Sequence, residues 1–211
     1  ELAAVDITTT KMEVGPTAHY VMGGVKVDPE SQESTISGLY AAGEAATGLH
    51  GANRLGGNSL SDLIVFGKIA GESAASRAAE MNGFTEIPED EIADVISETL
   101  APFTREGGEN PAAVVEDLRE MMQEKVGIIR TGKLLQEALK DLDELESRAA
   151  ITSPGGSRIY NPGWHQALEL GAMIDVSRMC ALAALEREES RGGHTRDDFP
   201  VPDHSHWGKV N

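Results

Sequence analysis

The spacing of apolar residues changes near position 82, and this change divides the chain into two parts. Before it, apolar positions alternate with polar residues or glycine around Val21, Val25 and Val27, which predicts short strands. After it, apolar residues recur every three or four positions in stretches broken by glycine or proline, which predicts helices. The whole pattern predicts an α+β fold in which a helical bundle follows a mixed first part.

The first part is predicted to hold two short strands and one long helix. The strands lie in "AHYVMGGVKVDPE" and "SGLYAAGE" and form a hairpin or a similar pair, with "PESQEST" as the turn. The helix begins at about Asn58 or Ser59, where Ser59 and Asp62 have a spacing like that of a capping box. Its apolar face includes Gly67 and Gly71, so we expect another backbone segment to pack close against it.

The second part is predicted to form four helices and a tail. The helices cover about 89–104, 110–126, 131–150 and 163–190. One apolar stripe marks the third as a bundle helix: Leu135, Leu139, Leu142 and Leu145. Glycines and prolines after residue 190 predict an extended tail that lies over other parts of the protein. The predicted division is therefore 1–84, a helical domain at 85–190 and a tail at 191–211.

Composition narrows the classes of function. The chain has 18 basic and 35 acidic residues and a net charge of −17, which disfavours nucleic acid and anionic membrane surfaces as partners. A single cysteine, Cys180, excludes an internal disulfide and fits a reducing compartment. No apolar run is long enough to span a membrane. His204 and His206 lie in "DHSH" without a third ligand at metal-site spacing, so we expect a solvated tail and no metal there.

A Gly-rich turn, "HGANRLGGNSL", leads directly into the predicted long helix. Helix N-termini bind anions because their first amide N–H groups lack acceptors and the helix dipole is positive there. Arg54 adds a planar guanidinium suited to a carboxylate or phosphate. The turn matches neither a Walker loop nor a GxGxxG fingerprint. Taken alone, Arg54 is as compatible with tying loops together as with binding a ligand.

Two further residues are candidates because of their places near predicted strands. His19 precedes a glycine pair that would let a ligand approach, and Glu44 follows a short apolar run where a carboxylate could accept hydrogen bonds from sugar hydroxyls. An isolated histidine is more often structural, and an isolated glutamate more often lies on the surface.

Three blocks together are more specific than any one of these residues. They are "PTAHYVMGGVKVD", "GLYAAGEAATGLHGANRLGGNSLSDLIVFGKIAG" and "ESRGGHTRDDFP". In this order, they closely resemble the C-terminal part of the flavoprotein subunit of succinate dehydrogenase and fumarate reductase. L-aspartate oxidase belongs to the same wider family. The resemblance implies that residues 1–84 are the C-terminal segment of a split FAD-binding α/β domain whose N-terminal half is absent.

The resemblance also implies roles for individual residues. His19 and Arg54 look like the ligands of the substrate carboxylates. Glu44 looks like the residue that binds ribityl or ribose hydroxyls of FAD, and the backbone of Ser59 and Leu60 looks like the contact to the pyrimidine edge of the flavin. The implied reaction interconverts succinate and fumarate by hydride transfer to or from flavin N5. In this family, the proton is shuttled by an arginine on a capping domain that precedes this region.

The implied partners are a dicarboxylate substrate, an iron–sulfur subunit and membrane-anchor subunits, with a cytoplasmic location on the inner face of the cell membrane. We expect the 211-residue chain to be inactive without its N-terminal half. One alternative is an L-aspartate oxidase-type enzyme, although "GGHTRDDFP" looks more like the dehydrogenase and reductase. The other is a non-catalytic helical module that docks onto the iron–sulfur subunit. His194 and Arg196 belong to the third block, and we expect them to pin the tail onto the flavin domain.

Overall fold

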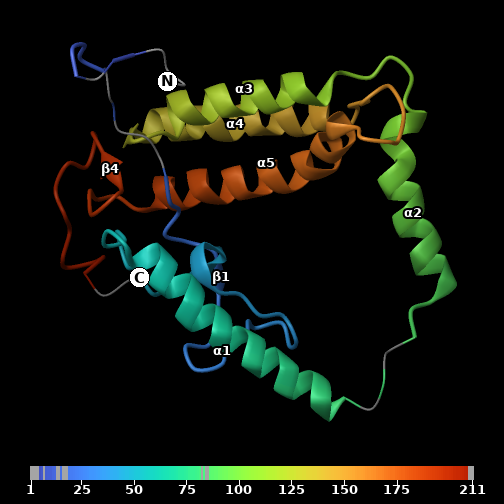
Figure 1. Ribbon diagram of the computed structural model, residues 1–211. Helices are drawn as coiled ribbons and strands as arrows, with labels where there is room; N and C mark the ends of the chain where they lie inside the picture. The colour runs from blue at the N-terminus through green and yellow to red at the C-terminus, as the bar shows by residue number, and fades with distance from the viewer. Residues whose placement is uncertain are drawn as a thin grey trace.

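The structure is a computed structural model that describes residues 5–6, 8–12, 15, 19–81, 83 and 86–208. It is rich in helix and has few strands, in agreement with the predicted α+β class (Figure 1). The helices are α1 Asn58–Glu80, α2 Glu89–Thr104, α3 Pro111–Lys125, α4 Gly132–Ala149 and α5 Pro162–Glu186. The strands are β1 Val25–Lys26, β2 Ala46–Thr47, β3 Ile129–Arg130 and β4 Thr195–Arg196, and a 3-10 turn, η1, covers Gly43–Ala45.

Helices α3, α4 and α5 pack side by side into a bundle that holds the hydrophobic core (Figure 1). The core includes the predicted leucine stripe of α4, of which Leu135 and Leu142 are fully buried. Each helix begins at a capping side chain that accepts a hydrogen bond from a backbone N–H of the first turn: Asn110, Thr131 and Asn161. These caps satisfy amide groups that a helix start would leave without partners. The predicted bundle helices are therefore confirmed to within one residue at their starts.

The predicted end of the last helix was wrong. Helix α5 ends at Glu186 rather than near 190, because its final carbonyl groups are capped by a side chain of the tail. The buried Arg196 guanidinium donates from one nitrogen to the carbonyl oxygens of Ala184 and Leu185, at 2.8 and 3.0 Å. The same guanidinium binds Asp198, whose carboxylate also accepts from Gly132 N at the start of α4. Arg196 and Asp198 thus tie the ends of two helices together.

The first part contains fewer strand residues than predicted, and their pairing differs. β1 pairs with β2 in parallel, so of the two expected arrangements, a hairpin or a similar pair of short strands, the hairpin does not form. Antiparallel pairing is limited to single bridges, such as Val27 with Ser34, around a turn at 28–32. The parallel pair needs a close approach at Gly24, whose φ is 128° and where an added Cβ would lie 2.7 Å from the Ala45 carbonyl carbon. The "SGLYAAGE" stretch forms no strand and ends in η1.

Helix α1 begins as predicted at Asn58, but its start is not a capping box. The N-cap is Gly57, in the left-handed region at φ 83°, and no side chain caps the helix. Asp62 instead turns away from the N-terminus and is buried against other residues. The expected close backbone contact is also wrong within the described chain, because an added Cβ at Gly67 or Gly71 would meet nothing within 4 Å.

Helix α2 matches its predicted range and lies beside the bundle, at the right in Figure 1. Its contact with the bundle is at its C-terminal end, where the Trp164 indole N–H of α5 donates to Thr99 O at 2.8 Å and Phe103 packs edge-on to the ring. Apolar side chains nearer its start, including Val95, are exposed. No helix in the described residues is long and apolar enough to cross a membrane.

Candidate functional site

Arg54 lies in the Gly-rich loop just before α1, and its surroundings differ from those of an arginine held in a salt bridge. Its guanidinium lies over the ring of Tyr20, with 4.6 Å between Cζ and the ring centroid. One terminal nitrogen donates to Leu55 O at 3.1 Å. Its buried Nε has no hydrogen-bond partner among the described residues. A buried N–H of this kind is costly. Leu55 O is the one hydrogen-bond partner of the terminal nitrogens among the described residues, so these nitrogens are the part of the side chain that is suited to an incoming anion.

Tyr20 is held in place by a small polar network at the first turn of α1. Its hydroxyl donates to Asp62 Oδ2 at 3.2 Å, and His50 Nε2 lies 3.1 Å from the same oxygen. The Tyr20 and His50 rings pack edge to face with 5.5 Å between centroids. Asp62 is 5% exposed, so this carboxylate needs both donors to be stable in the interior. The network joins the His19–Tyr20 segment, the Gly-rich loop and α1.

The phenol of Tyr20 is kept protonated by its surroundings. Burial raises its pKa above the ordinary value, and the hydrogen bond to Asp62 and the negative charge of that carboxylate raise it further. The charge of Glu44 acts in the same direction, and Arg54 opposes it. Tyr20 therefore remains a hydrogen-bond donor to Asp62 and a neutral ring under Arg54 over a wide pH range.

Glu44 lies in η1, beside β2, and is exposed. Its Oε1 accepts a hydrogen bond from Val21 N at 2.9 Å, two residues after His19. Its other oxygen has no partner among the described residues and can accept a hydrogen bond from a ligand. The turn fits tightly onto α1, because an added Cβ at Gly43, where φ is 70°, would overlap Leu63.

The remaining predicted site residues lie at the edges of this arrangement. His19 is exposed and forms no hydrogen bond within the described chain. Ser59 and Leu60 occupy the first turn of α1, where backbone N–H groups have no acceptor inside the helix. Since no side chain caps this N-terminus, these amides are open to a ligand. The structure thus brings together Arg54, Tyr20 next to His19, and Glu44 through Val21, but it forms no direct bond between any two predicted site residues.

Sequence reasoning missed Tyr20, His50 and Asp62. The first two stand beside predicted site residues in "HYVMGG" and "HGANR", which was a usable signal. Asp62 was misassigned to a local capping role, because its contacts come from segments far from it in sequence.

The structure shows what the tail residues His194 and Arg196 contact. Besides the Arg196 contacts, His194 accepts at Nδ1 from Arg130, 2.9 Å away, so its Nε2 carries the hydrogen and donates to Arg187 O at 3.1 Å. Burial lowers the pKa of His194, and the positive charge of Arg130 also lowers it, while the Arg187 carbonyl opposes these effects. Both residues hold the tail on the bundle, whereas they were expected to pin it onto the flavin domain. Across the described residues, no group of three or more His, Cys, Asp and Glu side chains could hold a metal ion.

Two family models match this chain. The one described as "FAD binding domain" matches residues 2–60, and the one described as "Fumarate reductase flavoprotein C-term" matches residues 115–211. The first therefore covers the Gly-rich loop, Glu44 and the start of α1, and the second covers most of the bundle and the tail. Together they define the class, a flavoprotein in which a helical region follows the FAD-binding domain.

Individual relatives narrow this class. The fumarate reductase flavoprotein subunit of Escherichia coli (strain K12) is 41% identical over 197 residues, which cover 92% of this chain and 33% of that protein. The succinate dehydrogenase flavoprotein subunit of Coxiella burnetii is 36% identical and matches 99% of this chain and 38% of its own length. The structure of Sdh1 from Mycobacterium smegmatis superposes with a TM-score of 0.90 at 50% identity, covering 96% of this chain and 34% of that one.

The chain belongs to the family of flavoprotein subunits of succinate dehydrogenase and fumarate reductase, and it corresponds to their C-terminal part. It spans about a third of the length of the curated relatives it matches.

Proposed function

We propose that this chain supplies the substrate clamp and part of the flavin-binding surface of a longer FAD-dependent oxidoreductase that interconverts succinate and fumarate. Arg54 carries the proposal: its guanidinium is stacked on a tyrosine, lies beside an open helix N-terminus and has a buried Nε without a partner. A dicarboxylate would bind the terminal nitrogens of this guanidinium. The sequence around it lies within the match to the FAD-binding family.

The residues present fit an FAD cofactor. The uncapped N-terminus of α1 offers the amides of Ser59 and Leu60 to a hydrogen-bond acceptor, and the helix dipole favours negative charge there. Glu44 keeps one carboxylate oxygen open for a hydroxyl group while Val21 N fixes the other. We infer that Ser59 and Leu60 hold the pyrimidine edge of the flavin and that Glu44 holds a ribityl or ribose hydroxyl. When bound, FAD would supply the hydride-accepting or hydride-donating N5 atom.

The protein side chains would bind and orient the substrate. Arg54 and His19 would grip the carboxylates, which fixes the central carbons of the dicarboxylate and restricts their motion before reaction. Tyr20, held by Asp62, would stop the guanidinium from rotating away from this position. Reaction also requires a proton donor or acceptor, which we assign to a part of the longer flavoprotein outside this chain.

The same hypothesis implies assembly. We propose a split FAD-binding domain that residues 1–84 complete, a helical domain at 85–190 and a tail at 191–211. We further propose an iron–sulfur subunit as electron partner and membrane-anchor subunits that hold the complex at the inner, cytoplasmic face of the cell membrane. The structural neighbours include a quinol-fumarate reductase with bound menaquinol, at 38% identity and a TM-score of 0.87.

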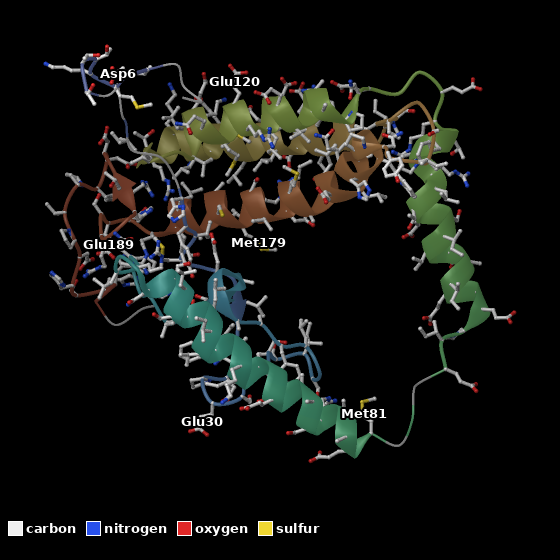
Figure 2. All side chains as sticks on the ribbon, viewed as in Figure 1. Asp6, Glu30, Met81, Glu120, Met179 and Glu189 are labelled. Atoms are coloured by element: carbon white, nitrogen blue, oxygen red, sulfur yellow. The ribbon has the colours of Figure 1, made fainter. Side chains whose placement is uncertain are left out.

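A second function is favoured by one observation, the exposed apolar side chains on the outer sides of the helical part. Ile96 of α2 and Val176 and Met179 of α5 are each more than half exposed. Figure 2 shows Met179 on the side of α5 turned away from α3 and α4. Surfaces of this kind mark protein interfaces. The helical part would then act as a docking module, and mutation there would weaken subunit association without changing flavin reduction by succinate.

The test uses Arg54→Ala in the full-length flavoprotein that contains this chain. We expect turnover of succinate and fumarate to be abolished while the flavin absorbance per protein is unchanged, because a substrate ligand has been removed and not a cofactor ligand. Glu44→Ala is the matched variant, and it should release flavin during purification. Near-normal turnover by Arg54→Ala would contradict the assignment.

A further inference from the structure

The C-terminal tail contacts the loop that carries Arg54. Gly193 N donates a hydrogen bond to Ala52 O, at 3.0 Å. At Gly192, an added Cβ would overlap the same carbonyl oxygen and would lie 2.6 Å from the Ala52 carbonyl carbon. At Gly193, an added Cβ would lie 3.3 Å from Met22 Cε. One glycine pair of the tail therefore touches both segments from which substrate ligands are proposed, the loop of Arg54 and the segment of His19.

The turn that carries this glycine pair is rigidly held. Arg191 N donates to His194 O at 2.8 Å, and His194 N donates to Arg191 O at 3.0 Å, which closes the turn on itself. The Arg191 guanidinium binds both oxygens of Glu189, each at 2.8 Å. Glu189 is fully buried and also accepts from Asp203 N, so the turn is anchored through a carboxylate beside the end of α5. Figure 2 shows Glu189 where the tail approaches the start of α1.

We propose that the Gly192–Gly193 turn is a positioning element that fixes the loop at 50–54 for dicarboxylate binding. This proposal rests on the proposed function of Arg54. The loop is anchored at its start, where His50 binds Asp62, but less so at its end: Arg54 contacts only Leu55 O and the Tyr20 ring among the hydrogen bonds and ring contacts of the described chain. In the sequence, Ala52 lies midway between His50 and Arg54. A contact that fixes its carbonyl group therefore limits how far the backbone of either residue can shift. The helical part of the protein thereby determines the geometry of the substrate clamp.

Gly192→Ala tests the contact, and the chain offers a matched control in Gly155→Ala. The two glycines have nearly the same backbone angle, φ 59° and 58°, but an added Cβ at Gly155 meets nothing within 4 Å. Both variants therefore place an alanine at the same positive φ, and only Gly192→Ala pushes against Ala52. The measurements, in the full-length flavoprotein, are steady-state kinetics with succinate and hydrogen–deuterium exchange of the peptide covering 48–57.

We expect Gly192→Ala to raise the KM for succinate by about 10-fold or more, since small displacements of a binding group have large effects, with faster exchange in 48–57 and unchanged flavin content. Gly155→Ala should match the wild type in both. If the 48–57 peptide exchanged at the same rate in both variants, the contact between the turn and the loop would be contradicted. If Gly192→Ala showed faster exchange but an unchanged KM, the positioning role would be contradicted. If Gly192→Ala does not fold, Glu189→Gln, which weakens the two hydrogen bonds from Arg191 that anchor the turn, should show the same effects at smaller size, and unchanged exchange and KM in that variant would overturn the proposal.

The exchange measurement separates this proposal from the proposed function. If succinate did not reduce the flavin of the wild-type flavoprotein, the proposed function of Arg54 would be refuted. The positioning role, which depends on that function, would then be refuted too. Faster exchange of 48–57 in Gly192→Ala would still establish the contact in that case.

Discussion

Helices α4 and α1 are both long and rich in apolar residues, yet they bury them to very different extents. Leu135 and Leu142 of α4 are fully buried, whereas Leu60 and Ile64 of α1 are 68% and 73% exposed. The partners of α4 are its neighbours in sequence, α3 and α5. Among the described residues, α1 packs mainly on η1. Burial therefore depends on which segments are available to pack, and in the proposed flavoprotein the rest of the FAD-binding domain would cover α1.

The largest expected effect comes from the bundle core. Leu142→Ala removes a fully buried side chain and leaves a cavity, so we expect the free energy of unfolding to fall by about 2–5 kcal/mol. Ile64→Ala on the exposed face of α1 should change it by no more than about 0.5 kcal/mol. Urea unfolding of the 211-residue chain, followed by circular dichroism, measures both. Similar losses from the two variants would show that the face of α1 is buried in solution.

Arg196→Ala should have the next largest effect. It removes the cap on the α5 carbonyls, at a cost of about 2–3 kcal/mol from unsatisfied buried groups, and it also removes the guanidinium that binds Asp198. Arg196→Lys is the control, because it keeps the charge but cannot reach the carbonyls and the carboxylate together. The same unfolding assay applies. Full stability in Arg196→Lys would show that charge alone holds the tail.

Acid should release the tail before it unfolds the bundle. The hydrogen bonds from Arg191 lower the pKa of Glu189 to about 2. Because this pKa is lower in the folded state, the stabilisation is present above about pH 4.5 and is lost as the pH falls toward 2. Trp207 lies against the Arg187 guanidinium, so its fluorescence should change when the tail is released. The Trp207→Phe variant measures the contribution of Trp164, which is subtracted. Glu189→Gln should remove most of this pH dependence. If the acid-induced fluorescence change were the same in Glu189→Gln, the release of the tail would depend on other carboxylates.

The smallest effect is expected at the start of α1. Ser59→Ala should leave stability within about 0.5 kcal/mol of the wild type, because the N-cap is Gly57 and no side chain caps the helix. Asn110→Ala, at the start of α3, should cost about 1 kcal/mol because its side chain accepts from Ala112 N. Thermal unfolding of both variants compares them. If Ser59→Ala lost as much stability as Asn110→Ala, the Ser59 side chain would cap the helix after all, as the capping-box prediction stated.

Local signals predicted the bundle well and the site only in outline. Asn followed by Pro at 110–111 and 161–162 places a cap and a first helical residue together, so these helix starts are encoded where they occur. The end of α5 is not encoded locally, because the acidic residues after Glu186 are compatible with a helix. The helix ends there because Arg196 binds its last carbonyl groups. A contact between residues distant in sequence cannot be inferred from local spacing.

The same limit applies to the candidate site. The motifs around His19, Glu44 and Arg54 were visible in the sequence, and their roles stay proposals. The buried network of Tyr20, His50 and Asp62 was not predicted, since its three members come from separate segments and meet only in the folded chain. Asp62 was assigned to a capping box from its spacing to Ser59, so its contacts with Tyr20 and His50 were not considered.

The pairing of Arg196 with Asp198 has a consequence for the order in which the protein is made. These two residues close the end of α5 and the start of α4, but they are synthesised after both helices. A nascent chain that has not reached residue 198 would hold the apolar parts of the bundle with two helix ends unsatisfied. Completion of the helical part therefore waits until residues 196–198 have left the ribosome, and a chain truncated before Arg196 would be an early target for quality control.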